Sequence, residues 1–521
     1  MTVQAATMPE LIGRMGEWGE RELFLHTDGF DIRSWSYGRA IATARRVVAL
    51  LGRKGVAPGD RVMLWAPNSP EWATTFLGCF LAGVVPVPID LRFRPPFLRE
   101  VASQTEASLL FITQARTNPL SGIQAIALES LEETLEGVGG EAFQPAQPSA
   151  DDMAEIVYTS GTTAHPRGVV LTHRNLMSEL EAFQPVVPTE PEYRFLSVLP
   201  LSHIFEQMGG LLLPISRGGT VIYPATVRPS TLLRVLRREH PNAMMVVPRF
   251  MELLQDRILR EIRSRPPVEL AFRALLTLSP HLPLTARRWL FRPVLRDLGG
   301  CLKYLVSGGA PLDPGLEAFW ESVGMIVLQG YGLTETASAV TCTRVGDTRL
   351  GSVGKPLSNQ EIRLAADGEI LVRGENVTPG YYRRPDLTAD AFEDGWLKTG
   401  DVGFLDSDGY LYIRGRKKEM IVTSSGVNVY PEDVERVLNQ LPGVRDSAAV
   451  EWKGKVHAVL LLDPGVDPRL IVRQANLRLD PSQRIQGHTV WPYPDFPRTA
   501  TMKVRKASVL DYLRSRGAEA A

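Results

Sequence analysis

The densest group of side chains suited to chemistry lies in the segment IVYTSGTTAHPRGVVLTHRNL, residues 156–176. A β-branched and aromatic run enters a cluster of small and hydroxyl residues, and a helix-like segment follows. The cluster offers amide N–H groups freed by Gly161 and the permanent cation of Arg167. Its hydroxyl donors are Thr159, Ser160, Thr162 and Thr163. Hydroxyls, amides and a guanidinium on one turn indicate a polyphosphate-binding loop.

A polar surface turn is the alternative interpretation, because Gly, Ser and Thr are common in loops. Six consecutive small or hydroxyl residues after a buried-type strand, at 159–164, make that alternative weak. The chain contains no GxxxxGK[ST], no GxGxxG that opens a helix and no GxSxG. A P-loop NTPase, a nicotinamide enzyme and a serine hydrolase are therefore disfavoured.

The elements that must hold this loop alternate between helical and strand patterns. Apolar spacing predicts a helix over residues 37–54, a short strand over 59–67 and a second helix over 70–82. This alternation favours parallel sheets covered by helices. A polar stretch at 137–152 separates this part from the loop region. After Asp401 and the charged segment 414–419, about a hundred residues read as a smaller α+β domain of ordinary size.

Length and charge limit the class of protein. A chain of 521 residues is too long for one core and predicts two or more domains. Lys plus Arg equals Asp plus Glu at 58 each, so no nucleic-acid partner is expected. Cys79, Cys301 and Cys342 are far apart, which argues against zinc or disulfides and predicts small buried side chains in a reducing cytoplasm.

No secretion or membrane-spanning segment is expected. The N-terminus has early acidic residues and no apolar h-region. The most apolar stretch, residues 74–89, is interrupted by Pro86 and Pro88 and is shorter than the ~20 residues that a spanning helix needs. It is better explained as a buried helix that leads into a strand. We expect a soluble cytoplasmic protein that could still contact a membrane surface.

Four further segments, taken with the loop, resemble the adenylate-forming superfamily of acyl-CoA synthetases, peptide-synthetase adenylation domains and luciferases. They are YGLTET at 331–336, WLKTGD ending at Asp401, GRKKEMIVTSSGVNVYPEDVE at 415–435 and PRTATMKVRK at 497–506. Their order and spacing agree with that superfamily over nearly the whole chain. The resemblance implies an α/β fold with a large N-terminal domain of packed mixed β-sheets and helices, residues 1–415. A small, mobile C-terminal α+β domain would follow over residues 416–521, with its hinge at Lys418.

The resemblance also assigns roles to particular residues. Glu335 would hold Mg²⁺, Thr334 would bond a phosphate and Lys503 would reach the reacting carboxylate. Asp401 would bind the ribose, and Arg416 would add a ribose or phosphate contact. The adenine side would be formed by Tyr331, Gly332 and the SGGAPL residues Gly309, Ala310 and Pro311, and the pantetheine tunnel would be lined near Ser425 and Gly426. Helix capping is the alternative role for Thr334 and Glu335.

The implied reaction joins a carboxylic acid to ATP as an acyl-adenylate and then to a thiol, with ATP, Mg²⁺ and coenzyme A required. The segment PLSHIFEQMGGLLLPISRGGTVIY at 200–223 resembles the long-chain fatty acyl-CoA synthetase branch. His203 would lie near the carboxylate, and a structural role is the alternative for this lone histidine. An apolar groove would suit an alkyl tail, which gains ~0.8 kcal/mol per buried methylene. Alternatives are transfer to the phosphopantetheine of an acyl carrier protein and a catalytically weak acyl- or nucleotide-binding homologue.

Two further features bear on these alternatives. Ala164, Arg167 and Met502 stand where the superfamily usually has glycine, lysine and glycine. Ala164 is costly if that position needs φ above zero, Arg167 keeps the charge without being equivalent to lysine, and Met502 could restrict how Lys503 swings in. Residues 228–297 contain fourteen Arg against six Asp or Glu, an excess of eight positive charges. We interpret that excess as solvated helix faces, with attraction to anionic lipid as the alternative.

Overall fold

The computed structural model describes residues 5–139, 144–159, 166–190, 192–422, 428–499 and 502–519. Packing divides the chain into two compact units. The large unit comprises Met1–Glu361 and Val372–Leu397, and the small unit comprises Ile362–Leu371 and Lys398–Ala521. The fold class is therefore the one expected, an α/β protein with a large and a smaller part. The domain boundary expected between residues 415 and 416 and the hinge expected at Lys418 concern motion rather than packing, and both stay predictions.

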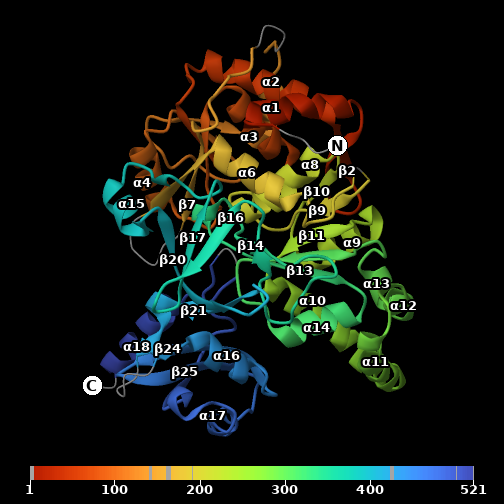
Figure 1. The fold of residues 1–521 in the computed structure, drawn as a ribbon. Helices are drawn as coiled ribbons and strands as arrows, with labels where there is room; N and C mark the ends of the chain where they lie inside the picture. The colour runs from red at the N-terminus through yellow and green to blue at the C-terminus, as the bar shows by residue number, and fades with distance from the viewer. Residues whose placement is uncertain are drawn as a thin grey trace. The chain divides into compact units, whose positions relative to one another are not determined.

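A nine-stranded sheet forms the centre of the large unit, in the order β15-β14-β13-β12-β11-β9-β10-β1-β2 (Figure 1). The strands β1, β9, β10, β11, β12 and β13 are parallel to their neighbours in this run, and β2, β14 and β15 are antiparallel edges. Their bounds are β1 Glu22–Thr27, β2 Ile32–Ser36, β9 Arg194–Leu196, β10 Thr220–Pro224, β11 Ala243–Val246, β12 Tyr304–Ser307, β13 Ile326–Tyr331, β14 Thr341–Cys342 and β15 Lys355–Pro356.

Both faces of this sheet are buried. Successive residues of a strand point to opposite faces, so Phe195 and Met245 belong to one apolar cluster and Leu196 and Met244 to the other. Helices cover both faces, which explains why these strands read as continuous apolar runs. The helices around this sheet are α6 His173–Phe183, α9 Pro229–Glu239, α10 Pro248–Arg263, α11 Pro266–Leu278, α12 Leu284–Leu290, α13 Arg292–Asp297 and α14 Pro314–Ser322.

A second, fully parallel sheet has the order β4-β3-β5-β6 and confirms the predicted alternation. The predicted helices are α2 Tyr37–Arg53 and α3 Pro70–Leu81, whose N-caps Ser36 and Ser69 accept from backbone N–H groups. The apolar stretch at 74–89 is the buried end of α3 leading into β4, as expected. The strands are β3 Arg61–Trp65, β4 Val85–Pro88, β5 Leu109–Ile112 and β6 Gln124–Ala127, and the nearby helices are α1 Met8–Arg14, α4 Pro95–Thr105 and α5 Leu131–Thr134.

The segment predicted to bind phosphates begins in one strand and ends in another that pairs with it. Strands β7 Met153–Thr159 and β8 Arg167–Thr172 are antiparallel, and β18 Gly380–Tyr381 extends the sheet beside β8. The prediction that a helix-like segment leaves the loop is therefore wrong. Val169, Val170 and Thr172 favour a strand that pairs with β7, and α6 begins only at His173.

The segment of the sequence in which the two units meet, residues 360–416, contributes a five-stranded sheet. Its strand order is β16-β17-β20-β19, with β21 beside β20. Its bounds are β16 Gln360–Leu364, β17 Glu369–Gly374, β19 Phe392–Glu393, β20 Trp396–Leu405 and β21 Leu411–Arg416, with α15 Pro385–Ala391 between β18 and β19. The strand-like segment after Asp401 is thus the β20–β21 hairpin, as its turn residues indicated.

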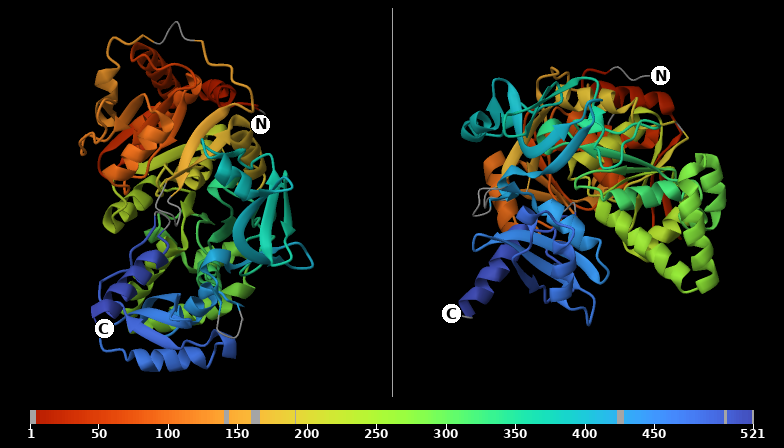
Figure 2. Two further views of the ribbon diagram at one scale, coloured as in Figure 1. Left: turned by 90° about the vertical axis from the view of Figure 1, so that its left-hand side faces the viewer. Right: turned by 60° about the horizontal axis from the view of Figure 1, so that its bottom comes forward.

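The rest of the small unit is an α+β layer. Strands β24 Val444–Trp452, β25 Lys455–Leu462 and β26 Gly487–Val490 form a sheet, and β22 Ile421–Val422 pairs with β23 Asn428–Val429. Helices α16 Pro431–Asn439 and α17 Pro468–Asn476 pack on one face through Leu438 and Ile471. Helix α18 Lys506–Glu519 packs on the opposite face through Val509 and Leu513 (Figures 1 and 2).

Two expectations about surface and core need correction. Cys79 and Cys342 are buried as expected, but Cys301 is exposed because it lies in the turn between α13 and β12. In the arginine-rich stretch, Arg238 donates to Phe30 O at 2.8 Å and Arg288 to Gly324 O at 2.9 Å. These arginines secure loop carbonyls rather than being simply solvated. None of the described helices is long and apolar enough to cross a bilayer.

The segment that resembles the long-chain branch is buried in the core. It forms α7 Ile204–Glu206, a π-helical turn over Gln207–Leu212 and α8 Leu213–Ser216. Burial raises the pKa of Glu206 to about 8, although contacts with Ser197 and the Leu199 backbone oppose the shift. Burial likewise raises the pKa of Glu155 to about 8, against a contact with Gln207. Both acids are therefore largely protonated in the folded protein at neutral pH.

Glu206→Gln should remove a pH-dependent loss of stability. The pKa of Glu206 rises from 4.5 to about 8 on folding, so its stabilising contribution is complete below pH 4.5 and declines as pH rises through 8. The free energy of unfolding of the variant, relative to the unchanged protein, should increase by on the order of 3 to 4 kcal/mol between pH 5 and pH 8. Urea unfolding at the two pH values measures this difference. Glu133→Gln, at an exposed position of α5, is the control and should show no such trend.

Candidate functional site

The carboxyl edge of the parallel strands collects several of the predicted residues. Gly309, Ala310 and Pro311 follow β12, Tyr331 to Glu335 end or follow β13, and His203 follows β9 at the start of α7. Parallel strands that end at one edge bring their following loops together, which is where open α/β sheets bind ligands. At this edge Gly308 approaches the ring of Phe205, since a Cβ there would lie only 2.9 Å from Phe205 Cζ.

Thr159 and Arg167 face each other at the base of the phosphate-loop hairpin, as the last and first residues of β7 and β8. Ser160, Gly161, Thr162, Thr163 and Ala164 lie outside the described residues, so their predicted roles stay predictions. The paired residues Thr159 and Arg167 therefore mark the two ends of the loop.

Glu335 lies close to this stem through Tyr381. The Tyr381 hydroxyl donates to Glu335 Oε1 at 2.8 Å, and Thr378 N donates to the Glu335 carbonyl at 2.8 Å. Tyr381 stands opposite Val169 of β8. Burial, followed by the negative charge of Glu335, raises the pKa of the Tyr381 hydroxyl, and Arg167 opposes the shift. Arg167 and Glu335, which are far apart in the sequence, therefore act on the same hydroxyl group.

The backbone that carries Glu335 is tightly constrained. Thr334–Thr336 form one 3₁₀ turn rather than the start of an α-helix, so the helix-capping alternative is not what the structure shows. Ala337 and Ser338 follow with φ of 51° and 132°, values that L-residues rarely adopt. The chain then folds back so closely that position 332 must be glycine, because a Cβ there would lie 2.1 Å from the Ser338 carbonyl oxygen.

A buried polar network holds this turn in place. Glu179 of α6 accepts from Ala339 N at 2.6 Å through Oε1, and from Gln360 Nε2 at 3.1 Å and Asn376 Nδ2 at 3.3 Å through Oε2. Asn376 Nδ2 also donates to Thr336 O at 2.7 Å. Glu179 is fully buried, and burial raises its pKa well above 4.5 although these three donors oppose the shift. The network joins α6 to both ends of the turn that follows Glu335.

His203 pairs with an acid that the sequence did not single out. Its Nε2 lies 2.9 Å from Oδ2 of Asp90, and Arg92 Nη2 lies 2.6 Å from the same oxygen. Burial alone would raise the pKa of Asp90, but the bonds with His203 and Arg92 lower it overall. Asp90 is therefore ionised, and it fixes the orientation of a ring that is about a third exposed.

In the small unit, the structure brings Asp401 and Arg416 together. They stand opposite each other on β20 and β21, with Arg416 Nε 2.7 Å from Asp401 Oδ1. The Asp401 side chain is only 6% exposed, and its backbone N–H donates to Thr399 Oγ1 at 3.1 Å. This hairpin holds a carboxylate and a guanidinium at fixed positions. Nearby Lys417 pairs with Asp367 at 2.6 Å and Glu369 at 2.7 Å.

Lys503 lies in a hydrogen-bonded turn before α18. Thr499 N donates to Lys503 O at 2.8 Å, Met502 N donates to Thr499 O at 3.0 Å, and Arg498 Nη1 donates to Met502 O at 3.0 Å. Met502 has φ of 63°, in the left-handed region that favours glycine. The lysine Nζ of Lys506 is clamped among Glu419 at 3.2 Å, Glu435 at 3.2 Å and Glu432 at 3.9 Å. Ser425 and Gly426 lie outside the described residues.

The donor set around Glu335 fits Mg²⁺. In the described ranges no group of three or more His, Cys, Asp or Glu side chains could hold a metal by itself. Mg²⁺ is commonly bound through one or two carboxylates together with substrate phosphates and water. A single carboxylate beside the stem of the predicted phosphate-binding loop satisfies that requirement, and Tyr381 occupies only one of its oxygens.

Sequence reasoning missed Tyr381, Glu179, Asn376 and Asp90. Glu179 left a usable signal, because it falls at helical spacing among Leu176, Leu180 and Phe183, and an acid within an apolar stripe needs buried partners. Asp90 follows a buried strand, where ligand-facing residues are common. Nothing local distinguishes Tyr381, whose role depends on the pairing of β18 with β8.

Glu179→Ala should destabilise the protein strongly. The substitution leaves Ala339 N without its acceptor, removes one of the acceptors of Gln360 Nε2 and of Asn376 Nδ2, and creates a cavity in a dry site. We expect the free energy of unfolding in urea to fall by about 3 kcal/mol. Glu181→Ala is the matched control, since Glu181 is exposed on the same helix, and it should change stability by less than about 0.5 kcal/mol. Equal effects at both positions would contradict a supporting role of the Glu179 network.

Met502→Gly should relieve backbone strain next to Lys503. An L-residue in the left-handed region costs about 1 kcal/mol. Glycine avoids this cost, but its greater conformational freedom in the unfolded chain offsets part of the gain. We expect Met502→Gly to be more stable than Met502→Ala by about 1 kcal/mol in urea unfolding. The alanine variant keeps the Cβ and removes the rest of the side chain, so the comparison isolates φ. Equal stability of the two variants would show that this turn carries no strain.

Comparison with known proteins identifies the family of this chain. The family described as AMP-binding enzyme matches residues 16–382. The long-chain-fatty-acid–CoA ligase FadD15 of Mycobacterium bovis is 31% identical over 532 residues, covering 88% of this chain and 88% of that protein. A feruloyl-CoA synthase of an Amycolatopsis species is 30% identical over 84% of this chain and 85% of that protein. ATP-bound MatB from Rhodopseudomonas palustris superposes with a TM-score of 0.82 at 25% identity, covering 96% of this chain and 98% of that one. The resemblance is confirmed, and the chain belongs to the AMP-binding enzyme family as an AMP-forming acid–CoA ligase.

Proposed function

We propose that this ligase activates a medium- or long-chain fatty acid with ATP and transfers the acyl group to coenzyme A. The observation that carries the chemistry is the convergence of Arg167 and Glu335 on Tyr381 at the base of the phosphate-loop hairpin. A cation and a metal-binding carboxylate beside a phosphate loop are what attack on an α-phosphate needs, because charge develops on several phosphate oxygens.

The first step forms a bond between a carboxylate oxygen of the acid and the α-phosphorus. The bond between the α-phosphorus and the bridging oxygen breaks, and pyrophosphate leaves. Thr159, the loop hydroxyls and Arg167 bind the phosphates, and Thr334 adds a hydrogen bond. Glu335, oriented by Tyr381, would hold Mg²⁺, which supplies charge neutralisation between the phosphates. Lys503 approaches the reacting carboxylate and α-phosphate and stabilises their charge.

The remaining contacts position the nucleotide. Asp401 accepts from the ribose hydroxyls, and Arg416, already bonded to Asp401, adds a ribose or phosphate contact. Tyr331, Gly332 and the loop at Gly309–Pro311 lie against the adenine. In the second step the thiol sulfur bonds to the acyl carbon, the acyl–phosphate bond breaks and AMP leaves. Ser425 and Gly426 would then line the pantetheine path, after the small domain has turned about Lys418.

Three features support a fatty acid as the substrate. The relative FadD15 is named as a long-chain-fatty-acid ligase, whereas other relatives act on ferulate or sulfoacetate. The SHIF segment places Phe205 and His203 at the carboxyl edge of the sheet, and both side chains are partly exposed there. The helical residues that follow them, from Met208 to Ile215, belong to the buried apolar core. The alkyl tail of a fatty acid would therefore lie over this segment rather than within it.

Contact with a membrane surface would supply such a substrate. Helices α10 to α12 project from the large unit (Figure 2) and expose Leu253, Leu270, Leu278 and Trp289, the last of them 72% exposed. Arg257, Arg263 and Arg265 on the same helices and the turn between them have no acidic partner among the described residues. Apolar side chains among unpaired arginines suit the surface of an anionic bilayer.

A catalytically weak acyl-nucleotide-binding protein is the second candidate. The observation that favours it is Met502, whose left-handed backbone places a strained residue directly before Lys503. It stands second because Thr334, Glu335, Asp401, Arg416 and Lys503 are all present. Transfer to an acyl carrier protein instead of coenzyme A is the remaining alternative for the acceptor.

Pyrophosphate release from Mg-ATP tests these alternatives with short, medium and long fatty acids and aryl acids, each with and without coenzyme A. We expect release with one fatty-acid class and thioester formation only with coenzyme A. Lys503→Ala should lower kcat for release by about 100-fold while ATP still binds, because a preorganised charge acts on the transition state. Lys455→Ala, an exposed lysine on β25, is the matched control and should behave as the unchanged protein. ATP binding without release for any acid would overturn the ligase and favour the binding protein.

A further inference from the structure

The turn that carries Lys503 lies between two basic side chains that are largely buried. Arg498 precedes the turn with 9% of its side chain exposed, and Lys506 follows it, as the first residue of α18, with 13% exposed. A buried cation needs acidic partners, because the loss of water otherwise disfavours its charge. We refer to Arg498 and Lys506 as the two anchors of the turn. Both belong to the small unit.

The first anchor ties the turn to strand β24. Arg498 pairs with Asp446 of β24 and lies 2.7 Å from Asp495 Oδ1. Its Nη1 also donates to the carbonyl of Met502 at 3.0 Å. The guanidinium thus joins the sheet of the small unit to the backbone of the residue directly before Lys503.

The second anchor ties the end of the turn to the 3₁₀ turn Lys417–Glu419, called the hinge segment below because the hinge is predicted at Lys418. Lys506 Nζ lies 3.2 Å from Glu419 Oε2 and 3.2 Å from Glu435 Oε1, and Glu432 Oε1 is 3.9 Å away. Burial by itself lowers the pKa of Lys506, but the charges of Glu435, Glu432 and Glu419 raise it overall. Lys506 is therefore charged and held between α16 and the hinge segment.

The acids around Lys506 have further partners that limit their movement. Glu435 Oε1 accepts from Ala449 N of β24 at 2.9 Å. Glu432 packs closely on β21, since a Cβ at Gly415 would lie 2.6 Å from Glu432 Oε2. Lys506 therefore joins α18 to α16, to β24 and to the end of β21.

Glu419 also responds to Lys503 itself. Burial raises the pKa of Glu419, but the charges of Lys506, Lys503 and Arg416 lower it overall. The carboxylate of the hinge segment is therefore ionised, and it lies near both the second anchor and Lys503. The same acid thus connects the predicted hinge with the turn that the anchors hold.

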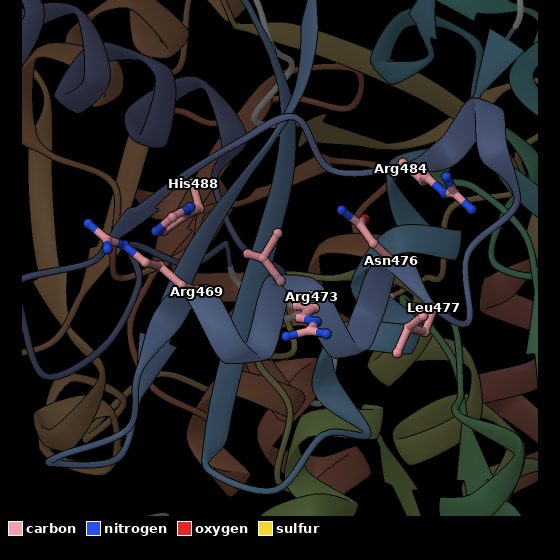
Figure 3. A pocket seen from close by; sticks show the side chains of 7 residues that line it. Arg469, Arg473, Asn476, Leu477, Arg484 and His488 are labelled. Carbon is pink, nitrogen blue, oxygen red and sulfur yellow. The ribbon is translucent and has the colours of Figure 1, made fainter.

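Pairing of this kind is not general among the cations of the small unit. Arg469, Arg473 and Arg484 line a hollow beside α17 (Figure 3), and they form no ion pair with an acid in the described ranges. Three carboxylates around the single ammonium of Lys506 are therefore a local feature. Buried ion pairs contribute little stability relative to apolar packing, so stability alone does not account for this cluster.

We propose that Lys506 is a positioning residue for Lys503, because its pairing with Glu419, Glu432 and Glu435 fixes the turn relative to the hinge segment. The small domain must deliver the Lys503 ammonium to the reacting carboxylate and α-phosphate, and a misplacement of about 1 Å lowers a rate by about 100-fold. The inference rests on the proposed function, in which Lys503 acts in adenylate formation and a different part of the small domain serves the thioester step.

The test separates the two half-reactions of Lys506→Met, which keeps the length of the side chain and removes its charge. Pyrophosphate release is measured from Mg-ATP and the acid that supports the fastest release, and thioester formation is measured from supplied acyl-adenylate and coenzyme A. We expect kcat for release to fall at least about tenfold with KM for ATP unchanged, because only the transition state loses a well-placed charge. Thioester formation should keep its rate. Lys506→Arg, which retains the charge, should restore most of the release.

Arg514→Met is the matched control. Arg514 also lies on α18 and pairs with Asp511 at 3.0 Å, but its side chain is 68% exposed. Both half-reactions should proceed in this variant as in the unchanged protein, because exposed ion pairs contribute little. Urea unfolding checks that all variants are folded. If Lys506→Met does not fold, Glu419→Gln replaces it, since that substitution leaves Lys506 with its two acids on α16.

Two results would overturn the inference alone. An equal loss in both half-reactions would mean that Lys506 only stabilises the fold, and an unchanged rate of release would mean that the turn needs no such support. The same criteria apply to Glu419→Gln. Failure of the proposed function has a different signature, because the unchanged protein would then release no pyrophosphate with any acid, and the inference would be lost with it.

Discussion

The strongest constraint on the large unit is that a carboxylate, Glu335, must lie beside the hairpin of β7 and β8, whose loop we propose binds phosphates. Two anionic groups at that distance repel each other unless a cation lies between them, and the carboxylate must still be aimed accurately. The chain meets this requirement with a hydroxyl from Tyr381 on one carboxylate oxygen and a guanidinium, Arg167, at the base of the hairpin. The strained turn after Glu335 follows from the same requirement, because only a sharply reversing chain returns Ala339 to Glu179 of α6.

The cost of this arrangement is visible in the buried acids of the large unit. Glu179 is placed in the core to hold the turn, and its three donors do not fully offset the loss of water. Glu155 and Glu206 lie in the core beside the π-helical turn and have raised pKa values for the same reason. π-Turns interrupt regular helix pairing and are frequent at functional sites, and this one follows His203 and the short helix α7 in the chain. These buried acids lower the stability of the large unit, and in return polar groups are held at fixed positions.

The charged side chains of the small unit are arranged differently. Most of its functional cations are paired within the unit, as Arg416 is with Asp401 and Lys506 with Glu419 and Glu435. These pairs fix the hairpin that carries Asp401 and the helix that follows the Lys503 turn. Arg469, Arg473 and Arg484, in contrast, form no ion pair with an acid in the part of the chain that the structure describes.

The sequence by itself determined the family, the α/β class and the residue types of the site, because ordered motifs such as YGLTET and the Thr/Ser/Gly loop are local in the chain. It also predicted α2, β3 and α3 closely, since their apolar spacing and serine caps are local signals. Only the tertiary structure decided that the loop leads into β8, since that strand is stabilised by pairing with β7. It likewise decided the partners of the site: Asp90 reaches His203 from another sheet, and Tyr381 reaches Glu335 only because β18 pairs with β8. Such contacts depend on strand order and long-range pairing, which residue spacing in one sequence does not encode.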